Sequence, residues 1–204
     1  MKFDEYKQVE QFSYKEYCTY LQDKYGIGLS DYFYPSWTKN PKVSRTKEGL
    51  VAHHKYEDEA IMLSDVKFAK QKPFEWQKAE NIVYCDYLEH LLLHILICED
   101  SSLKRRKDNV VVGFGGVVNY LVPELNDIYS GWEPKQQWKK NCVERIIDDI
   151  DVYYELISRF KMFAADFYEP GIYNDKMLYS SFGEQYGVWS KSQNKKIFSV
   201  IKTL

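Results

Sequence analysis

The sequence predicts an α+β protein that is mostly helical, with a small strand–strand–helix unit embedded between helical segments. Residues 49–54 form a short apolar run with the two-residue repeat of a strand, and residues 81–85 are rich in β-branched and aromatic residues. The second run leads into an apolar segment, 87–98, whose large residues recur every three or four positions, as on one face of a helix. Helical patterns also dominate the chain before and after this unit.

The segment before the unit is expected to be helical at first and then irregular. Residues 1–26 carry large apolar residues at helical spacing, and glycines end the pattern: Phe12, Tyr17, Tyr20 and Leu21, then Gly26 and Gly28. Prolines and several small polar residues in 29–48 favour loop structure.

The connection between the two strands, 55–80, is long and polar. Ordered loops of this length are often functional, and we expect a short helix within it near 65–70. Asp86 follows the second strand and is a suitable N-cap for the helix at 87–98. The packed side of that helix is expected to consist of Leu88, Leu91, Leu92, Ile95 and Leu96.

The C-terminal half contains a long helical pattern over 135–160, with acidic residues on its other side. We interpret this helix as scaffold or as the surface of a homodimer. The tail 190–204 is basic. No linker or repeat divides the chain, so we expect one domain over 1–204, with the strand–strand–helix unit at 49–98 and mainly helical surroundings at 1–48 and 99–204.

The composition is that of a globular chain with many aromatic residues, 18 of them tyrosine, which argues against disorder. The net charge of -2 gives no general affinity for nucleic acid, so any such surface has to be local. The longest strongly apolar stretch, 91–98, is too short for a membrane span, and the N-terminal residues do not resemble a signal peptide, so we expect a cytoplasmic protein. The four cysteines form no C-x-x-C pair and are expected to be free buried thiols: Cys18, Cys85, Cys98 and Cys142.

The distribution of histidine is the most informative feature of the chain. All four histidines fall between positions 53 and 94, as the adjacent pair His53 and His54 and the spaced pair His90 and His94. Histidine is the side chain best suited to binding a transition metal or moving a proton near neutral pH. His90 and His94 share one helix face, so they can converge on one ion. Two histidines four residues apart on an apolar helix are more often part of a packed core than metal ligands. The presence of His53 and His54 upstream favours a metal site here.

Two segments carry these residues, LVAHH at 50–54 and NIVYCDYLEHLLLH at 81–94. In the second segment Asn81 precedes His90 by nine residues, and His90 precedes His94 by four. This order and spacing resemble the HNH nuclease family, in particular its bacteriocin-type members, and imply the ββα-metal fold. The resemblance covers about a quarter of the chain. The connection between the strands is longer than in compact members, and the C-x-x-C pairs that hold a structural zinc in many members are missing.

Phosphodiester hydrolysis fits this set of residues. It needs an activated water and neutralisation of charge at the phosphate and on the leaving oxygen. His53, His90 and His94 can hold one divalent ion, Zn²⁺, Ni²⁺, Mn²⁺ or the abundant Mg²⁺, and leave positions open. His54 points to the other side of the strand from His53, so it is free to act as the general base. As the resemblance implies, Asn81 braces the loop and orients His54 by hydrogen bonding.

Other residues near the motif have an ordinary interpretation beside a functional one. Glu57, Asp58 and Glu59 can assist or bind a second ion, but we expect a solvated loop. Cys85 is a candidate ligand, with a buried thiol as the preferred interpretation. Two basic groups are candidates either for phosphate contact or for plain solvated surface: Lys104, Arg105, Arg106 and Lys107 after the metal helix, and Lys42, Arg45 and Lys47 before the first strand.

We therefore expect a metal-dependent endonuclease that hydrolyses DNA phosphodiester bonds and, as the resemblance implies, leaves 5′-phosphate ends. A role in phage, mobile elements or defence fits a chain without a secretion signal better than an exported toxin does. Two alternatives stay open: an RNA-cleaving or nonspecific toxic nuclease, and a non-catalytic binding or inhibitor protein that is stabilised by a structural metal.

Overall fold

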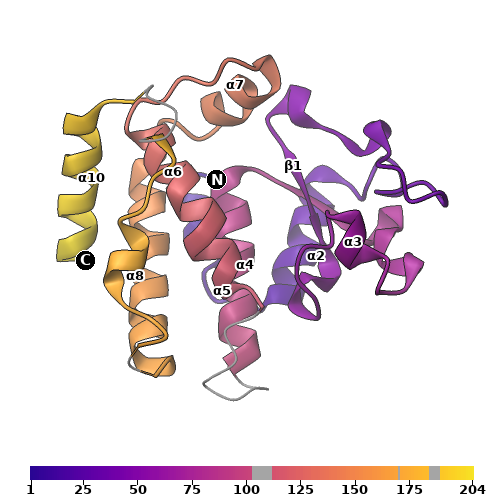
Figure 1. Ribbon diagram of the computed structural model, residues 1–204, viewed down its shortest axis with the longest axis horizontal. Coiled ribbons are helices and arrows are strands. Elements are labelled where there is room, and N and C mark those ends of the chain that lie inside the picture. Colours follow the sequence, from indigo (N-terminus) through magenta and orange to yellow (C-terminus); the bar gives the residue numbers. More distant parts are fainter. Residues whose placement is uncertain (103–111, 170, 184–188) are drawn as a thin grey trace.

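The structure is a computed structural model, which describes residues 1–102, 112–169, 171–183 and 189–204. It is mostly helical, and the described residues contain one small antiparallel sheet (Figure 1). The α-helices are α1 (Phe3–Val9), α2 (Tyr14–Tyr25), α3 (Val66–Ala69), α4 (Tyr87–Ser102), α5 (Phe114–Gly116), α6 (Val122–Tyr129), α7 (Gln137–Glu144), α8 (Ile150–Phe167) and α10 (Lys191–Thr203). The expected α+β class, mostly helical with a small sheet, is confirmed at this level.

The strands and the shorter turns lie mainly in the first half of the chain. The strands are β1 (Val51–His54) and β2 (Ile82–Cys85). Short 3₁₀ turns are η1 (Pro41–Val43), η2 (Thr46–Glu48), η3 (Lys55–Asp58), η4 (Phe74–Gln77), η5 (Ala79–Asn81) and η7 (Asp175–Leu178), and η6 (Val117–Leu121) is a π-helical turn between α5 and α6. The predicted loop at 29–48 thus contains two of these turns, and the short helix expected near 65–70 is α3.

The strand–strand–helix unit forms as the sequence predicts. β1 and β2 pair in antiparallel fashion, with His53 opposite Val83 and His54 opposite Ile82, and α4 follows β2 directly. α2 packs against β2 and α4, and every residue of β2 is fully buried. The predicted strands and helix are confirmed, and α4 continues beyond the predicted end to Ser102.

α4 is the central helix of the molecule. It packs against α2, α5, η6 and α8, and in Figure 1 it lies beside α6 and α8. The residues expected on its packed side are buried, and so are Leu93 and Ile97 on other faces. A helix that is apolar all round belongs in the interior. The helix that carries His90 and His94 is therefore held in place by packing of its apolar residues.

Two predicted helices are each interrupted. The N-terminal helical segment breaks before Ser13, whose side chain accepts a hydrogen bond from the Glu16 amide while Glu16 accepts one from the Ser13 amide, so that a capping box starts α2. The pattern at 135–160 gives α7 and α8 rather than one helix. At the break, the Ile146 carbonyl accepts a hydrogen bond from the Tyr129 hydroxyl (3.0 Å), and the Ile146 side chain is buried.

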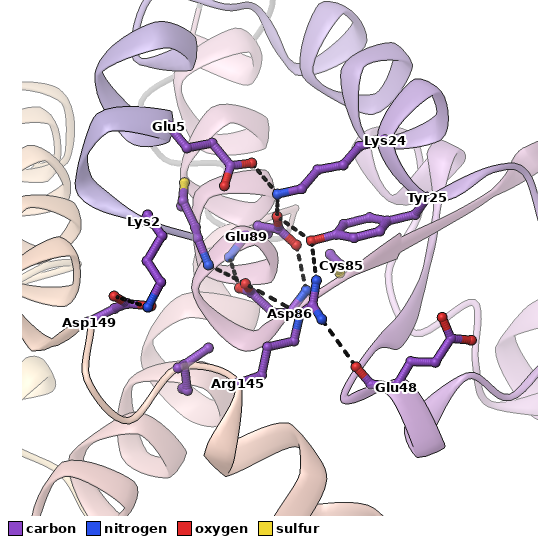
Figure 2. A network of polar contacts seen from close by, with 12 residues as sticks. Lys2, Glu5, Lys24, Tyr25, Glu48, Cys85, Asp86, Glu89, Arg145 and Asp149 are labelled. Atoms are coloured by element: carbon purple, nitrogen blue, oxygen red, sulfur yellow. Dashed lines mark hydrogen bonds and ion pairs between the residues drawn. The ribbon is translucent and has the colours of Figure 1, made fainter.

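A buried polar network fixes the start of α4 (Figure 2). The Asp86 amide donates to the Glu89 carboxylate (2.6 Å) and the Glu89 amide donates to Asp86 (2.8 Å). Glu89 also accepts from Lys24 (2.8 Å) and from the Tyr25 hydroxyl (2.9 Å), both on α2. Arg145, at the end of α7, donates to the Tyr25 hydroxyl (2.7 Å). Three helices thus meet at the turn that precedes the histidines of α4.

Two expectations from composition can be compared with the structure. All four cysteines, which lie in the described ranges, are free and buried, as predicted. Within the described parts of the chain, no helix has both the length and the apolar character needed to cross a membrane.

Candidate metal centre

Four side chains converge between β1, η3 and α4. His53, Glu57, His90 and His94 each offer one ligand atom, and these atoms all lie within 4.8 Å of one another. The ring centres of the three histidines are 5.1 Å apart for His53 and His90, 5.3 Å for His53 and His94, and 4.9 Å for His90 and His94. The strand and the helix thus bring together the three histidines that the sequence predicts as ligands, and η3 adds a carboxylate.

Glu57 lies at the centre of this group. One of its oxygens, Oε2, lies 3.5 Å from His53 Nδ1 and 3.4 Å from His94 Nε2. The other, Oε1, lies 3.5 Å from His54 Nδ1. The expectation of a solvated loop is wrong for Glu57, whose side chain is only 15 % exposed, because η3 turns the chain back immediately after β1. Glu59 is exposed, as expected.

Tyr14 of α2 fixes the hydrogen on His53. Its hydroxyl oxygen lies 2.9 Å from His53 Nε2 and also donates to the backbone, where the carbonyl of Lys55 is 3.0 Å away. A hydroxyl has one hydrogen, so when it donates to this carbonyl its oxygen accepts from His53 Nε2–H. His53 Nδ1 then carries the lone pair that points at Glu57. Metal-binding histidines are held in this way by an acceptor at the other nitrogen. No pattern in the sequence indicates this role of Tyr14.

The protonation of the group suits a cation. Burial lowers the pKa of His53 to about 3, and burial also lowers the pKa of His90 and of His94. Burial alone raises the pKa of Glu57, but the neighbouring His53, His54 and His94 bring it below its ordinary value. Near neutral pH the group therefore consists of neutral rings and an ionised carboxylate.

Three histidine nitrogens at the site have no hydrogen-bond partner among the described residues. The Nδ1 atoms of His53, His54 and His94 are buried without a hydrogen bond among the described residues. A buried carboxylate that faces lone pairs, with no hydrogen between them, is unfavourable unless a cation or a proton enters. Three imidazoles and a carboxylate are suitable ligands for Zn²⁺, Ni²⁺ or Mn²⁺. The residues present thus fit one divalent metal ion.

His54 lies beside the ligand group and outside it. Its Nε2 is 3.0 Å from Oε1 of Gln77, and its ring packs on Tyr32, with 4.4 Å between ring centres. His53 and His54 do not face fully opposite directions, because each approaches a different oxygen of Glu57. His54 is fully buried, so its surroundings are fixed by protein atoms.

The position of Asn81 differs in part from the expectation. Its amide donates to the carbonyl of Glu75 (2.7 Å), so it braces the loop between the strands, as the resemblance implies. It does not orient His54. The hydrogen bond to His54 is made by Gln77 instead. Asn81 lies at the end of η5, and its side chain is turned toward η4. Gln77 stands in a polar loop without any pattern, and the sequence gives no indication of its role.

The ligand group forms part of the wall of a cavity of about 430 Å³. Glu57, His90 and His94 line it, together with the loop after η3 and with α5 and η6. Gly116 lies against the ring of His94, and a Cβ atom at this position would be 2.3 Å from His94 Nδ1. A glycine is required here for the helix backbone to approach the ring.

The remaining candidates have varied positions. The basic run Lys104, Arg105, Arg106 and Lys107 lies outside the described residues. Arg45 donates to Glu48 (2.7 Å) and packs on the Tyr84 ring, which is a structural role, whereas Lys42 and Lys47 are exposed. Cys85 is a buried thiol and does not belong to the ligand group.

The centre thus combines a three-histidine, one-carboxylate donor set with a fourth histidine that is held separately. Such a donor set is compatible with a catalytic ion or with a structural one. Comparison of the chain with protein-family models, with curated proteins and with solved structures finds no match.

Proposed function

We propose that this chain is a metal-dependent HNH-type endonuclease that hydrolyses DNA phosphodiester bonds. One divalent ion is held by His53, His90 and His94, and His54 is the general base. The observation that supports this most is the convergence of three histidines and a carboxylate, whose ligand atoms lie within 4.8 Å of one another, beside a cavity and a further histidine. His53 Nδ1 faces Glu57 and is buried without a hydrogen bond among the described residues, and a core packed only for stability has no reason to leave it so.

The order of the elements supports the same proposal. β1 ends in the two histidines, Asn81 comes immediately before β2, and α4 carries the spaced pair, which is the arrangement that the resemblance to HNH nucleases implies. Asn81 braces the connecting loop through Glu75. The loop between the strands is longer than in compact members, and it supplies Glu57 and Gln77 to the site.

Each residue has a chemical task in this proposal. A divalent ion at the site supplies charge neutralisation at the phosphate and on the leaving oxygen. His90, His94 and Glu57 line the cavity, which gives a phosphate access to the site. His54 accepts a proton from the attacking water, a task for which imidazole is suited near neutral pH. Tyr14 holds His53 in the tautomer that offers Nδ1 to the ion.

The presence of Glu57 favours particular ions. Together with the three histidines it would fill all four positions of a tetrahedral Zn²⁺. A six-coordinate ion such as Mn²⁺, Ni²⁺ or Mg²⁺ keeps two positions for substrate oxygens. We therefore expect these ions to support cleavage and Zn²⁺ to support it poorly.

A plasmid-nicking assay tests the proposal. Wild type, His54→Ala and His94→Ala are compared with Mg²⁺, Mn²⁺, Ni²⁺ and Zn²⁺, and single-stranded DNA and RNA are offered in parallel. We expect His54→Ala to abolish cleavage and to keep about one ion per chain, because His54 is outside the ligand group. His94→Ala should lose both cleavage and metal. Preferential cleavage of RNA would replace DNA as the substrate in the proposal.

A second function is favoured by one observation. Four protein ligands make a closed site for Zn²⁺, and closed sites are typically structural. In that case the chain is a non-catalytic binding protein whose metal stabilises the fold. Metal binding by wild type without cleavage of any of the three nucleic acids, with any of the four ions, would establish this second function and refute the first.

A further inference from the structure

Gln77 holds His54 in a defined orientation. Both side chains are fully buried, and Oε1 of Gln77 lies 3.0 Å from Nε2 of His54. The other side of the Gln77 amide group donates to the carbonyl of Leu63 (3.4 Å). The backbone carbonyl of Gln77 accepts from the Tyr32 amide (2.7 Å), and the Tyr32 ring packs on His54. The side-chain amide and the backbone of Gln77 are thus both held by hydrogen bonds, which oppose a flip of the amide group.

This arrangement determines which nitrogen of His54 carries the hydrogen. The carbonyl of Leu63 can only accept, so the NH₂ group of Gln77 has to face it. The oxygen of the amide then faces His54, and because this oxygen can only accept, Nε2 of His54 has to donate. In the neutral ring the second nitrogen, Nδ1, therefore has a lone pair and no hydrogen.

The free nitrogen points at the metal centre. His54 Nδ1 lies 3.5 Å from Oε1 of Glu57 and has no hydrogen bond among the described residues. The other oxygen of the same carboxylate contacts the ligand atoms of His53 and His94. Nδ1 thus faces the carboxylate of the ligand group, while Nε2 is turned away from the group, toward Gln77.

We infer that Gln77 is a positioning residue of this site, which keeps His54 in the Nε2–H tautomer so that Nδ1 is the atom that takes the proton. This inference rests on the proposed function for its catalytic part, and its structural part stands without it. In the reaction, Nδ1 would take one proton from the attacking water as the water oxygen bonds to phosphorus and the bond to the leaving 3′ oxygen breaks. The Gln77 oxygen would stabilise the resulting positive charge of the ring by accepting from Nε2–H.

The tautomer is measured directly by nitrogen-15 NMR of the histidine rings in the full chain, with and without Zn²⁺, which is diamagnetic. The His54 signals are identified by their loss in His54→Ala. We expect Nε2 to carry the hydrogen in wild type and in Gln77→Glu, which keeps an oxygen at this position. In Gln77→Met, which has no acceptor there, this preference should be lost. A wild-type ring protonated on Nδ1, or an unchanged tautomer in Gln77→Met, would overturn the inference.

Gln22→Met is the matched control. The side chain of Gln22 donates to the carbonyls of Glu80 and Ile82 (both 3.0 Å), so the same substitution removes hydrogen bonds to the backbone beside β2 without touching His54. We expect it to lower stability and leave the tautomer and cleavage unchanged. In Gln77→Met we expect kcat to fall about 100-fold, the lower end of what a positioned general base contributes, with metal content unchanged. Equal losses of kcat in both variants would show a merely structural role.

The NMR result and the cleavage result can fail separately. If wild type cleaves no nucleic acid with any ion, the proposed function fails, but the ring signals still decide whether Gln77 sets the tautomer. If wild type cleaves and the ring signals contradict the expected tautomer, the inference about Gln77 fails alone. Should Gln77→Met not fold, wild type and Gln77→Glu decide the tautomer.

Discussion

Replacing Glu57 by Gln should stabilise the metal-free protein and weaken the effect of metal. Without an ion, the carboxylate of Glu57 faces the ring nitrogens His53 Nδ1, His54 Nδ1 and His94 Nε2 at 3.4 to 3.5 Å. The rings stabilise it only when they are charged, and burial lowers the pKa of His53 and His94. The amide of glutamine places an NH₂ group at one of the two oxygen positions, so it can donate either to the nitrogens of His53 and His94 or to that of His54. Since a buried acceptor without a partner costs about 1–3 kcal/mol, we expect the metal-free variant to gain about 1–2 kcal/mol.

These changes in the free energy of unfolding correspond to measurable changes in melting temperature. For a chain of this length, 1 kcal/mol corresponds to about 2–4 °C, so the metal-free variant should melt about 2–8 °C higher than wild type. A ligand present at 100 times its Kd stabilises by about 2.7 kcal/mol, so metal should raise wild type by about 5–11 °C. If the substitution weakens binding about 10- to 100-fold, about 0.4–1.4 kcal/mol remains at the same metal concentration, or about 1–6 °C.

Thermal unfolding followed by circular dichroism measures both effects, once in a chelator and once with Ni²⁺ at 100 times the wild-type Kd. Glu59→Gln is the control, because Glu59 is exposed and lies only two residues from Glu57. We expect Glu59→Gln to have the same melting temperature as wild type in the chelator and the same increase with Ni²⁺. A lower melting temperature of Glu57→Gln in the chelator, or an equal metal effect in variant and wild type, would refute the role given to Glu57.

Three further predictions concern the supports of the site. Gly116→Ala should displace His94 and lower metal affinity measured by chelator competition, since its Cβ atom would meet Nδ1 at 2.3 Å; Gly115→Ala, whose Cβ atom would lie 3.5 Å from Asn119 Nδ2, should bind metal like wild type. Tyr14→Phe removes the acceptor of His53 Nε2–H and should lower metal affinity by about 10- to 100-fold in the same assay, while the ring keeps its place in the core. Burial raises the pKa of all four thiols, so a thiol reagent at pH 7 should label none in the native protein and four after unfolding; rapid labelling before unfolding would contradict the buried positions.

Much of the fold could be predicted because local patterns specify it. The two strands and α4 follow from the spacing of apolar residues and from the N-cap position of Asp86, and the i, i+4 spacing on one helix places His90 beside His94. The breaks in the N-terminal segment and in 135–160 were not predicted. The first depends on the reciprocal hydrogen bonds of Ser13 and Glu16, and the second on a contact between Ile146 and a distant tyrosine.

The site was predicted less completely than the fold. His90 and His94 have the i, i+4 spacing of one helix face and the resemblance places His53 beside them, so the convergence of these three candidate ligands could be expected. Glu57, Gln77 and Tyr14 reach the site through tertiary contacts, because η3 turns the chain back, the long loop folds over His54, and α2 packs on the sheet. A carboxylate in an acidic run and a glutamine in a polar loop carry no periodic pattern that marks them as buried.

The burial of apolar residues on several faces of α4 has a consequence for any attempt to isolate the motif. Residues 49–98 alone would expose Leu93, Ile97 and their neighbours, which α2, α8 and η6 cover in the whole chain. Each such side chain contributes about 1.5–3 kcal/mol when buried, and a few of them equal the entire stability of an ordinary domain. The strand–strand–helix unit therefore needs the surrounding helices in order to fold. An excised peptide would be expected to aggregate, and transplanting the motif would require a host that covers the apolar faces of its helix and leaves the histidine side beside a cavity.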